Sequence, residues 1–175
     1  MISMQSSKLT ILLLLAYFLS AKIILADVED LRKLLQKDYV KTSHKWKTDI
    51  TEISDHMPYG FDEIEGEQYS IICSVGEDYI PGKINKGKAN YTQNFEEKEC
   101  LKWKFVEGRL VHELDFSSSK CRYPLGKVGD KRFYNGVVHL KTGLVVGKVY
   151  ENLNVIEYSR NGVVEIRKNN FYIIC

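Results

Sequence analysis

Two Gly-Lys pairs, each set in an apolar stretch, are the residues of this chain best suited to holding a polar ligand. The pairs are Gly82-Lys83 and Gly147-Lys148. Neither is a phosphate-binding loop, because each lacks the upstream glycine and is followed by an aliphatic residue where that loop needs a hydroxyl. A lysine ammonium can donate three hydrogen bonds. A lysine that recurs in the same setting therefore indicates a binding scaffold before it indicates an enzyme.

Catalytic motifs are absent from the sequence. It contains no Gly-x-Ser-x-Gly nucleophile elbow, no Walker loop and no Gly-x-Gly-x-x-Gly dinucleotide loop. Its four histidines are scattered, and neighbouring acids such as Asp62 and Glu63 need not face one another. No Cys-x-x-Cys or His-Glu-x-x-His spacing indicates a metal site. The sequence therefore predicts no catalytic residues, no metal and no cofactor, and the protein is not expected to be an enzyme.

The two Gly-Lys pairs belong to two diverged copies of one β-rich unit, and each copy is expected to turn through its pair. Five landmarks recur after 65 or 66 residues, which is the signature of an internal repeat. The landmarks are the corners Pro58-Tyr59-Gly60 and Pro124-Leu125-Gly126, then Tyr69 and Tyr134, Lys83 and Lys148, Glu99 and Glu165, and Phe105 and Phe171. The copies span residues 58–112 and 113–175.

Apolar and polar residues alternate from Pro58 onward, which predicts half-buried strands. The first expected strand of each copy lies around Tyr69 and Tyr134, and residues 107–120 are expected to connect the copies. Further strands are expected at residues 90–95, 100–106, 144–150, 155–159, 163–168 and 170–175. Neither copy has enough strands to cover a core alone. The fold class is therefore mainly β, with two tandem antiparallel repeats packed about a pseudo-twofold axis.

The N-terminal region differs from these copies. Residues 1–26 have a lysine and then a short apolar run and small residues, which is typical of a secretory signal peptide. The alternative is an uncleaved membrane anchor, but Lys22 leaves the run short of a spanning length. Residues 27–57 form an extension in which Val28 to about Tyr39 has the periodicity of a short amphipathic helix. The mature protein is therefore expected to be secreted, with no membrane span.

Cleavage after Ala26 would remove two of the 25 basic residues and none of the 23 acidic ones, so the mature chain is neutral. A neutral chain without a basic stripe has no electrostatic footprint for nucleic acid, which is not expected as a partner.

Four cysteines lie in the mature part, and an even number in a secreted chain favours two disulfides. Three pairings are open, and Cys73 could instead be a buried free thiol within an apolar strand. The candidates are Cys73, Cys100, Cys121 and Cys175.

A single sequon, Asn90-Tyr91-Thr92, predicts glycosylation of Asn90 on an exposed loop after the first lysine turn.

The segment from Tyr59 to Tyr69, together with Pro81-Gly82-Lys83, resembles the DM-nine repeat of natterin-like proteins and invertebrate mannose-binding lectins. That repeat has the pattern Gly-x-Asp-x-x-Gly-x-x-x-Tyr, a Pro-Gly-Lys turn and a Gly-Lys-Glu-like segment. The chain carries Gly60, Asp62 and Tyr69 in place, one extra residue before Gly66, and Glu97-Lys98-Glu99 where the last segment falls. The resemblance spans Pro58 to Cys175 and is fainter in the second copy.

In sugar-binding members of that family, an aspartate and the lysine of the turn hold ligand hydroxyls, so the resemblance implies ligand-binding roles for Asp62 and Lys83. The second copy keeps Lys148, but Asp62 aligns there with Lys127 or Val128. A site without a placed carboxylate could suit an acidic sugar or a phosphate. A single such site binds weakly, so useful avidity needs two sites, a homo-oligomer or a surface that displays many glycans.

Two functions stay open at this point. The favoured one is a secreted, mannose-type carbohydrate-binding protein, in immune recognition or host contact. The alternative is a secreted protein-interaction or effector module that keeps the scaffold without binding sugar.

Overall fold

Antiparallel strands make up nearly all of the regular structure in the part of the chain that the structure describes, so the prediction of a mainly β fold is confirmed. The computed structural model describes residues 41–43, 45–50, 53–115, 124–151 and 154–175, all within one unit, Lys37–Cys175. The predicted signal peptide and the helix from Val28 to Tyr39 lie outside these residues. No helix in the described part of the chain is long and apolar enough to cross a membrane.

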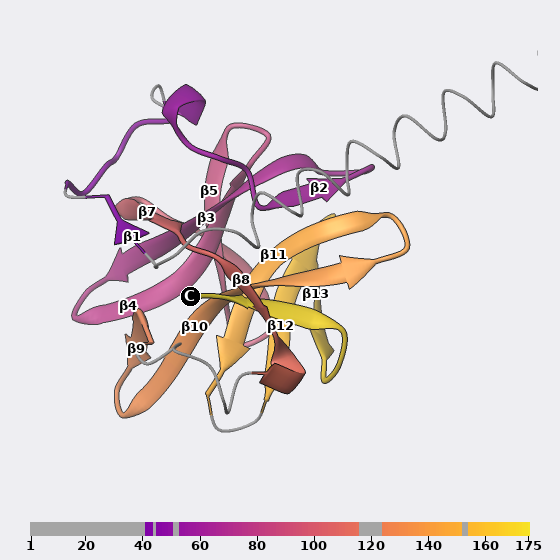
Figure 1. The fold of residues 1–175 in the computed structure, drawn as a ribbon. Coiled ribbons are helices and arrows are strands. Elements are labelled where there is room, and N and C mark those ends of the chain that lie inside the picture. The colour runs from indigo at the N-terminus through magenta and orange to yellow at the C-terminus, as the bar shows by residue number, and fades with distance from the viewer. Residues whose placement is uncertain (1–40, 44, 51–52, 116–123, 152–153) are drawn as a thin grey trace, which may run out of the picture. The chain divides into compact units, whose positions relative to one another are not determined.

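Most strands fall into two sets with the same order (Figure 1). The first strand set is β2 (Gly60–Asp62), β3 (Gly66–Val75), β4 (Asp78–Asn85), β5 (Lys88–Gln93), β6 (Glu96–Glu99) and β7 (Trp103–Glu107). The second strand set is β9 (Gly126–Val128), β10 (Lys131–Leu140), β11 (Gly143–Tyr150), β12 (Val155–Arg160), β13 (Val163–Arg167) and β14 (Phe171–Ile174). In each set the first five strands pair consecutively, and the last strand returns to the long second strand.

The remaining elements flank these sets. Strand β1 (Lys41–Thr42) pairs with β7, and β8 (Leu110–His112) pairs with β14. Two 3-10 helices, η1 (Ile53–Asp55) and η2 (Glu113–Asp115), complete the described structure. The segment expected to connect the copies thus contains β8 and η2 rather than only loop. The charged strand β6 was also not predicted, because four successive charged residues have no apolar alternation.

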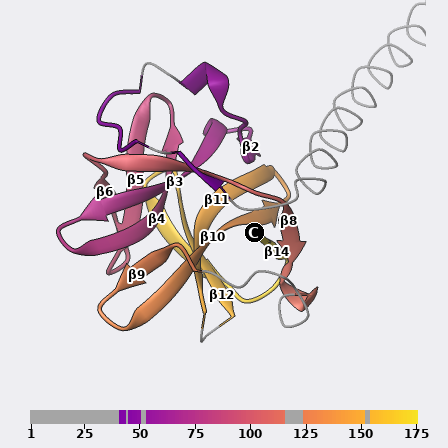
Figure 2. The same ribbon diagram turned by 60° about the vertical axis from the view of Figure 1, so that its left-hand side comes forward.

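Each set contributes its short first strand to the sheet of the other set. Strand β2 pairs with β11 through Phe61 opposite Leu144 and Asp62 opposite Gly143. Strand β9 pairs with β4 through Tyr79 opposite Lys127, and the β9–β10 hairpin lies beside β4 in Figure 2. The two sets are therefore joined by main-chain hydrogen bonds at both of these places.

Two separate apolar cores follow from the period-two patterns. One is built on the first set by residues such as Ile71, Ile84 and Trp103, and the other on the second set by residues such as Val138 and Ile156. The opposite face of each sheet carries buried polar residues. They include Ser70, Lys83 and Thr92 in the first set, and Asn135, Lys148, Glu157 and Ser159 in the second. These two faces meet, because the Asn135 amide donates to Ser70 Oγ at 2.9 Å and to the Ile71 carbonyl at 2.6 Å.

The predicted lysine turns are wrong, because both Gly-Lys pairs lie in strand interiors. Lys83 stands in β4 between Ser70 of β3 and Asn90 of β5. The glycines are required by close packing instead of by a turn. A Cβ atom on Gly82 would lie 2.4 Å from the carbonyl oxygen of Asn90, and one on Gly147 would lie 2.7 Å from that of Glu157.

The true turns lie elsewhere and are short. Lys86-Gly87 joins β4 to β5, and Asn161-Gly162 joins β12 to β13, with φ angles between 47° and 76° at all four residues. Two consecutive positive φ angles are typical of the type I′ hairpin turn. Both hairpin turns therefore fall at a residue followed by glycine. The glycines before the two lysines instead lie where a neighbouring strand packs too closely for a Cβ atom.

A disulfide joins Cys73 of β3 to Cys100, just after β6, with a Cα–Cα distance of 5.8 Å. The alternative of a free thiol at Cys73 is therefore wrong. Cys175 is buried, and no cysteine in the described residues is free. Cys121 lies outside the described residues.

Candidate functional site

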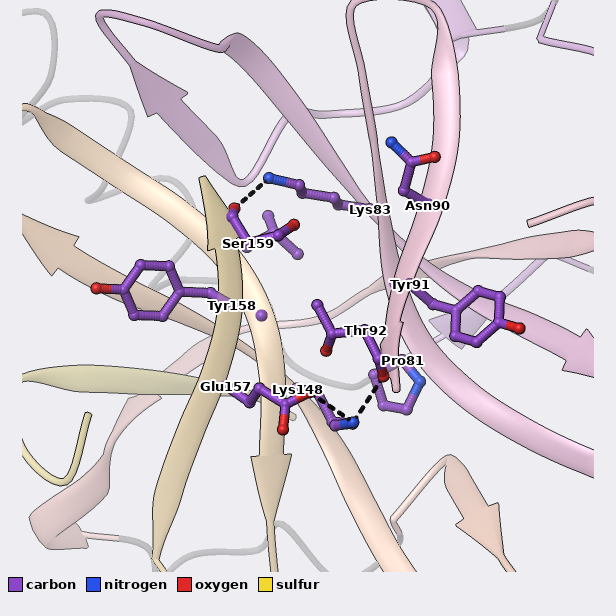
Figure 3. A pocket seen from close by; sticks show the side chains of 12 residues that line it. Pro81, Lys83, Asn90, Tyr91, Thr92, Lys148, Glu157, Tyr158 and Ser159 are labelled. Carbon is purple, nitrogen blue, oxygen red and sulfur yellow. Dashed lines mark hydrogen bonds and ion pairs between the residues drawn. The ribbon is translucent and has the colours of Figure 1, made fainter. Parts of the chain in front are cut away.

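A small hollow lies between the two strand sets, and both lysines of the Gly-Lys pairs line it (Figure 3). The hollow has a cavity volume of about 10 Å³, which is room for roughly one water molecule. Its lining comes from matching stretches of the two sets, Pro81, Gly82, Lys83, Asn90, Tyr91 and Thr92 from β4 and β5, and Val146, Gly147, Lys148, Glu157, Tyr158 and Ser159 from β11 and β12. The rings of Tyr91 and Tyr158 point away from it in Figure 3. The hollow therefore has a mixed lining, in which the buried side chains of Lys83, Lys148 and Glu157 lie beside apolar atoms.

Lys83 enters the hollow from the first set and is almost fully buried. Its ammonium donates to Glu65 Oε2 and, at 2.6 Å, to the main-chain carbonyl of Ser159 in the second set. Glu65 lies in the turn between β2 and β3 and also accepts from the Gln68 amide at 2.7 Å and from the Asn161 N–H at 2.8 Å. Lys83 thus belongs to a buried polar network that joins the two sets.

Lys148 enters from the second set and is held in a matching way. Its ammonium lies 2.9 Å from Glu157 Oε1 and donates to the main-chain carbonyl of Thr92 in the first set at 2.7 Å. Burial lowers the pKa of Lys148, although the Glu157 carboxylate opposes this shift. Burial alone would raise the pKa of Glu157, but hydrogen bonds from Thr92 and Tyr150 and the charge of Lys148 outweigh it and lower that pKa. The surroundings therefore favour the charged form of Glu157, while burial of Lys148 opposes the charged form of the ammonium beside it.

The two lysines make reciprocal contacts. Thr92 and Ser159 occupy corresponding places in β5 and β12, since each lies two residues after the residue paired with a lysine. Lys83 binds the carbonyl of one, and Lys148 binds the carbonyl of the other. The structure thus brings together two of the three predicted ligand-binding residues.

Asp62, the third predicted residue, does not line the hollow. It is almost fully buried, and both of its carboxylate oxygens are occupied. Oδ1 accepts from the main-chain N–H groups of Ile64 and Glu65 at 2.9 and 3.1 Å, and Oδ2 accepts from Thr142 Oγ1 at 2.9 Å and Arg160 Nε at 3.1 Å. Burial alone would raise its pKa, but these hydrogen bonds together lower it. Asp62 therefore stabilises the turn that carries Glu65, and Glu65 in turn contacts Lys83.

The strand pairing also shows which residue of the second set corresponds to Asp62. Asp62 lies opposite Gly66 in β3, and Val128 lies opposite Lys131 in β10. Val128 therefore occupies the place of Asp62, and the carboxylate is absent there.

The carboxylates that do reach the lysines, Glu65 and Glu157, were missed by the sequence analysis. The sequence contained an indication of Glu157. It is the single acid of the largely apolar strand β12, and the preceding strand β11 contains a single lysine. The indication of Glu65 was weaker, since this residue directly precedes Gly66, where the chain departs from the repeat pattern by one residue. The structure describes no group of three or more metal-ligating side chains among its placed residues.

Asn90 also differs from its expected setting. It is a half-buried residue of β5, paired with Lys83 on one side and Glu99 on the other, so the exposed loop predicted for the sequon is wrong. Its side chain lines the hollow.

Comparison with known proteins shows the fold and no more. No protein-family model matches the chain, and no curated protein sequence matches it. The crystal structure of the nematode sperm cell motility protein MFP2B is similar, with a TM-score of 0.55, 12% sequence identity and coverage of 77% of this chain. This chain spans 44% of the length of that protein. The DM-nine resemblance therefore stays a prediction.

Proposed function

We propose that this protein is a secreted carbohydrate-binding protein whose ligand site is the hollow between the two strand sets. The observation that carries the proposal is that the lysines of two buried Lys–Glu pairs line one small hollow. Burying an ion pair costs desolvation free energy that its mutual attraction often fails to offset. Two such pairs at one place are therefore poorly explained by stability alone.

The lysines retain capacity for a ligand. Among the residues that the structure describes, each ammonium has two hydrogen-bonding partners and could donate one further bond. The Lys148 ammonium also lies 5.4 and 5.2 Å from the ring centres of Phe133 and Tyr150. Because the hollow holds about one water molecule, it cannot enclose a sugar ring. We infer that a mannose-type sugar inserts a single hydroxyl in place of that water, while its ring rests at the mouth. Glu65 and Glu157 orient the two lysines, and Asp62, for which the family resemblance implies a ligand-binding role, does not line the hollow.

We also propose that the two sets are repeats related by a pseudo-twofold axis through the hollow. The reciprocal lysine contacts and the two equivalent cross-pairings, β2 with β11 and β9 with β4, support this arrangement. The hollow is then a single site shared by both copies, so avidity would come from a homo-oligomer or from a surface that displays many glycans.

Secretion is part of the same proposal. The signal-like residues 1–26 support it, and the Cys73–Cys100 disulfide is compatible with an oxidising compartment. Glycosylation of Asn90 bears on the site, because a glycan on this side chain would cover the hollow. The proposal therefore requires Asn90 to be unmodified in the active form, which the intact mass of the secreted protein measures.

Binding of the mature protein to mannan, measured by titration, tests the site. We expect Asn90→Ala and Lys148→Met/Glu157→Gln to weaken binding, because the first removes an amide at the rim and the second removes a donor without leaving Glu157 charged and unpaired. The Asn90 side chain makes no hydrogen bond to the protein in the described contacts, so Asn90→Ala should leave the melting temperature unchanged. The matched control is Lys141→Met, which removes an exposed lysine from the β10–β11 turn. Equal mannan binding by the wild type and all three variants would remove the sugar site.

The rival function is a protein-interaction module on the same scaffold. The small volume of the hollow and the internal partners of both lysines favour it. The similar fold of MFP2B, a nematode sperm cell motility protein, is compatible with it. A glycan array without hits, together with a protein partner recovered through residues 27–57, would select this alternative.

A further inference from the structure

A cluster of lysines and aromatic rings lies outside the residues that line the hollow. It consists of Trp46, Tyr79, Lys102, Lys104 and Lys127, and is called the Trp46 platform below. The rings of Trp46 and Tyr79 stack with centroids 5.7 Å apart and planes at 15°. The ammonium groups of Lys104 and Lys102 lie 4.8 and 5.6 Å from the centre of the Trp46 ring. Lys127 pairs with Tyr79 across β9 and β4, so both side chains lie on the same face of the sheet.

The main chain beneath the platform is fixed. Lys47 and Trp103 exchange two main-chain hydrogen bonds of 2.7 and 2.9 Å, which hold Trp46 against β7. The Ser74 N–H donates to the Lys102 carbonyl at 2.8 Å, and the disulfide joins Cys73, which precedes Ser74, to Cys100, which lies two residues before Lys102. The lysines are therefore presented from ordered backbone, which lowers the ordering cost of binding.

None of the three platform lysines, Lys102, Lys104 and Lys127, is held in an ion pair with a residue that the structure describes. The acids nearest in the chain to Tyr79 are Glu77, which is exposed, and Asp78, whose carboxylate accepts from the Gly129 N–H at 3.1 Å. Three lysines without ion pairs to the described residues are therefore available to an anionic ligand around this aromatic pair.

We propose that the Trp46 platform binds a sulfated polysaccharide. Sulfate groups would accept hydrogen bonds from the three ammonium groups, and a sugar ring would lie against Tyr79, which is 43% exposed. Single-stranded nucleic acid fits less well, because it needs successive free aromatic faces and the Trp46 ring is already covered by Tyr79 and two lysines. A membrane surface also fits less well, since recognition of anionic lipid typically takes clusters of four to eight basic residues.

Retention of the mature protein on immobilised dextran sulfate tests this site, with uncharged dextran as the matched matrix. We expect Lys102→Ala/Lys104→Ala to weaken binding roughly tenfold, since exposed ion pairs each contribute modestly. The effect should shrink as salt is raised. The control Lys141→Ala/Lys168→Ala removes the same charge from exposed positions elsewhere and should change binding less than about twofold. Trp46→Leu should weaken binding at unchanged net charge, because the ring orients both lysines.

Three results would overturn the proposal. The first is no retention of the wild-type protein on dextran sulfate. The second is equal weakening by the two double variants, which would show a response to net charge only. The third is tighter binding to phosphatidylserine vesicles or to single-stranded DNA than to dextran sulfate at the same salt concentration. Mannan binding by Lys102→Ala/Lys104→Ala should stay unchanged. The proposal for the Trp46 platform and the proposal for the hollow are therefore tested independently.

Discussion

Lys83 and Lys148 occupy the same place in two matching strand frames but take their negative partners from different elements. In the second set the partner is Glu157, directly across the ladder from Lys148. In the first set the corresponding cross-strand residue is Asn90, and the carboxylate comes instead from Glu65 in the turn between β2 and β3. The contact with the opposite set is the same for both lysines, a carbonyl oxygen of β12 or β5.

The comparison distinguishes a contact that backbone packing determines from a contact that different side chains can provide. The contact between each lysine and the opposite carbonyl depends on how the two sets pack, so it recurs in both. The position of the carboxylate can vary, provided that one carboxylate reaches each ammonium in a site closed to bulk water. A buried ammonium without such a partner would be strongly unfavourable.

The largest expected effect comes from breaking one of these pairs. Lys148→Met leaves Glu157 charged and buried without its cation, and we expect the free energy of unfolding to fall by about 3–5 kcal/mol. Adding Glu157→Gln should recover most of that loss, because the uncompensated charge is removed. Urea denaturation of the wild type, both single variants and the double variant measures the coupling. Additive losses would mean that the two residues do not act as a pair.

An exchange of partners sharpens the comparison in the first set. Glu65→Gln should destabilise the protein, and adding Asn90→Glu should restore about 1–3 kcal/mol, because it places a carboxylate where the second set has Glu157. The matched control adds Asn169→Glu to Glu65→Gln, which introduces the same charge at an exposed position between β13 and β14. Equal stability of the two double variants would show that the strand frames do not correspond at this position.

The disulfide is a second difference between the sets. Cys73 of β3 is bonded to Cys100, whereas the corresponding position of β10 is occupied by Val138, opposite Val145 in the ladder. Replacing both cysteines by alanine opens a loop with a sequence separation of 27 residues and should lower the free energy of unfolding by about 3 kcal/mol. Hydrogen exchange should rise more in β3 and β7 than in β10 and β14. Uniform loss of protection would contradict a local role.

The sequence predicted the strands better than the site, for physical reasons that differ by residue. Apolar alternation marks a buried face, so the strands around Tyr69 and Tyr134 and those of both cores were found. Gly82 and Gly147 were read as turn residues, because a sequence does not distinguish a glycine that needs positive φ from one pressed by a neighbouring strand. Lys83 and Lys148 were identified through their recurrence. Glu65 was not, because its contact with Lys83 depends on how a turn folds back over the sheet.

Alanine substitutions at the two close-packed glycines test whether contact with a neighbouring strand explains why these positions are glycine. Alanine at Gly82 would place Cβ 2.4 Å from the Asn90 carbonyl oxygen and 2.9 Å from Cys73 Sγ. Alanine at Gly147 would meet the Glu157 carbonyl oxygen at 2.7 Å. We expect losses of about 1–3 kcal/mol, larger at Gly82, because its neighbours include a disulfide sulfur and cannot shift easily. Alanine at Gly76, where a Cβ has open space but φ is +62°, is the control for backbone strain alone. If that control costs more than both buried positions, close packing does not explain the glycines before the lysines.

The smallest expected effect concerns Asp62, whose place in the second set is taken by the uncharged Val128. The folded state lowers the pKa of Asp62 below its ordinary value of 3.8, so the unfolded state takes up a proton first as the pH falls. The contribution of Asp62 is therefore complete above about pH 5 and is lost as the pH falls through 4 and toward the folded pKa. We expect Asp62→Asn to lower the free energy of unfolding by about 1–2 kcal/mol at pH 7 and to flatten its decline below pH 4. Asp130→Asn, at an exposed turn of the second set, should change neither quantity. If the acid dependence of Asp62→Asn matches that of the wild type, Asp62 does not hold the Glu65 turn as a carboxylate, and the asymmetry between the sets must arise from Glu65 alone.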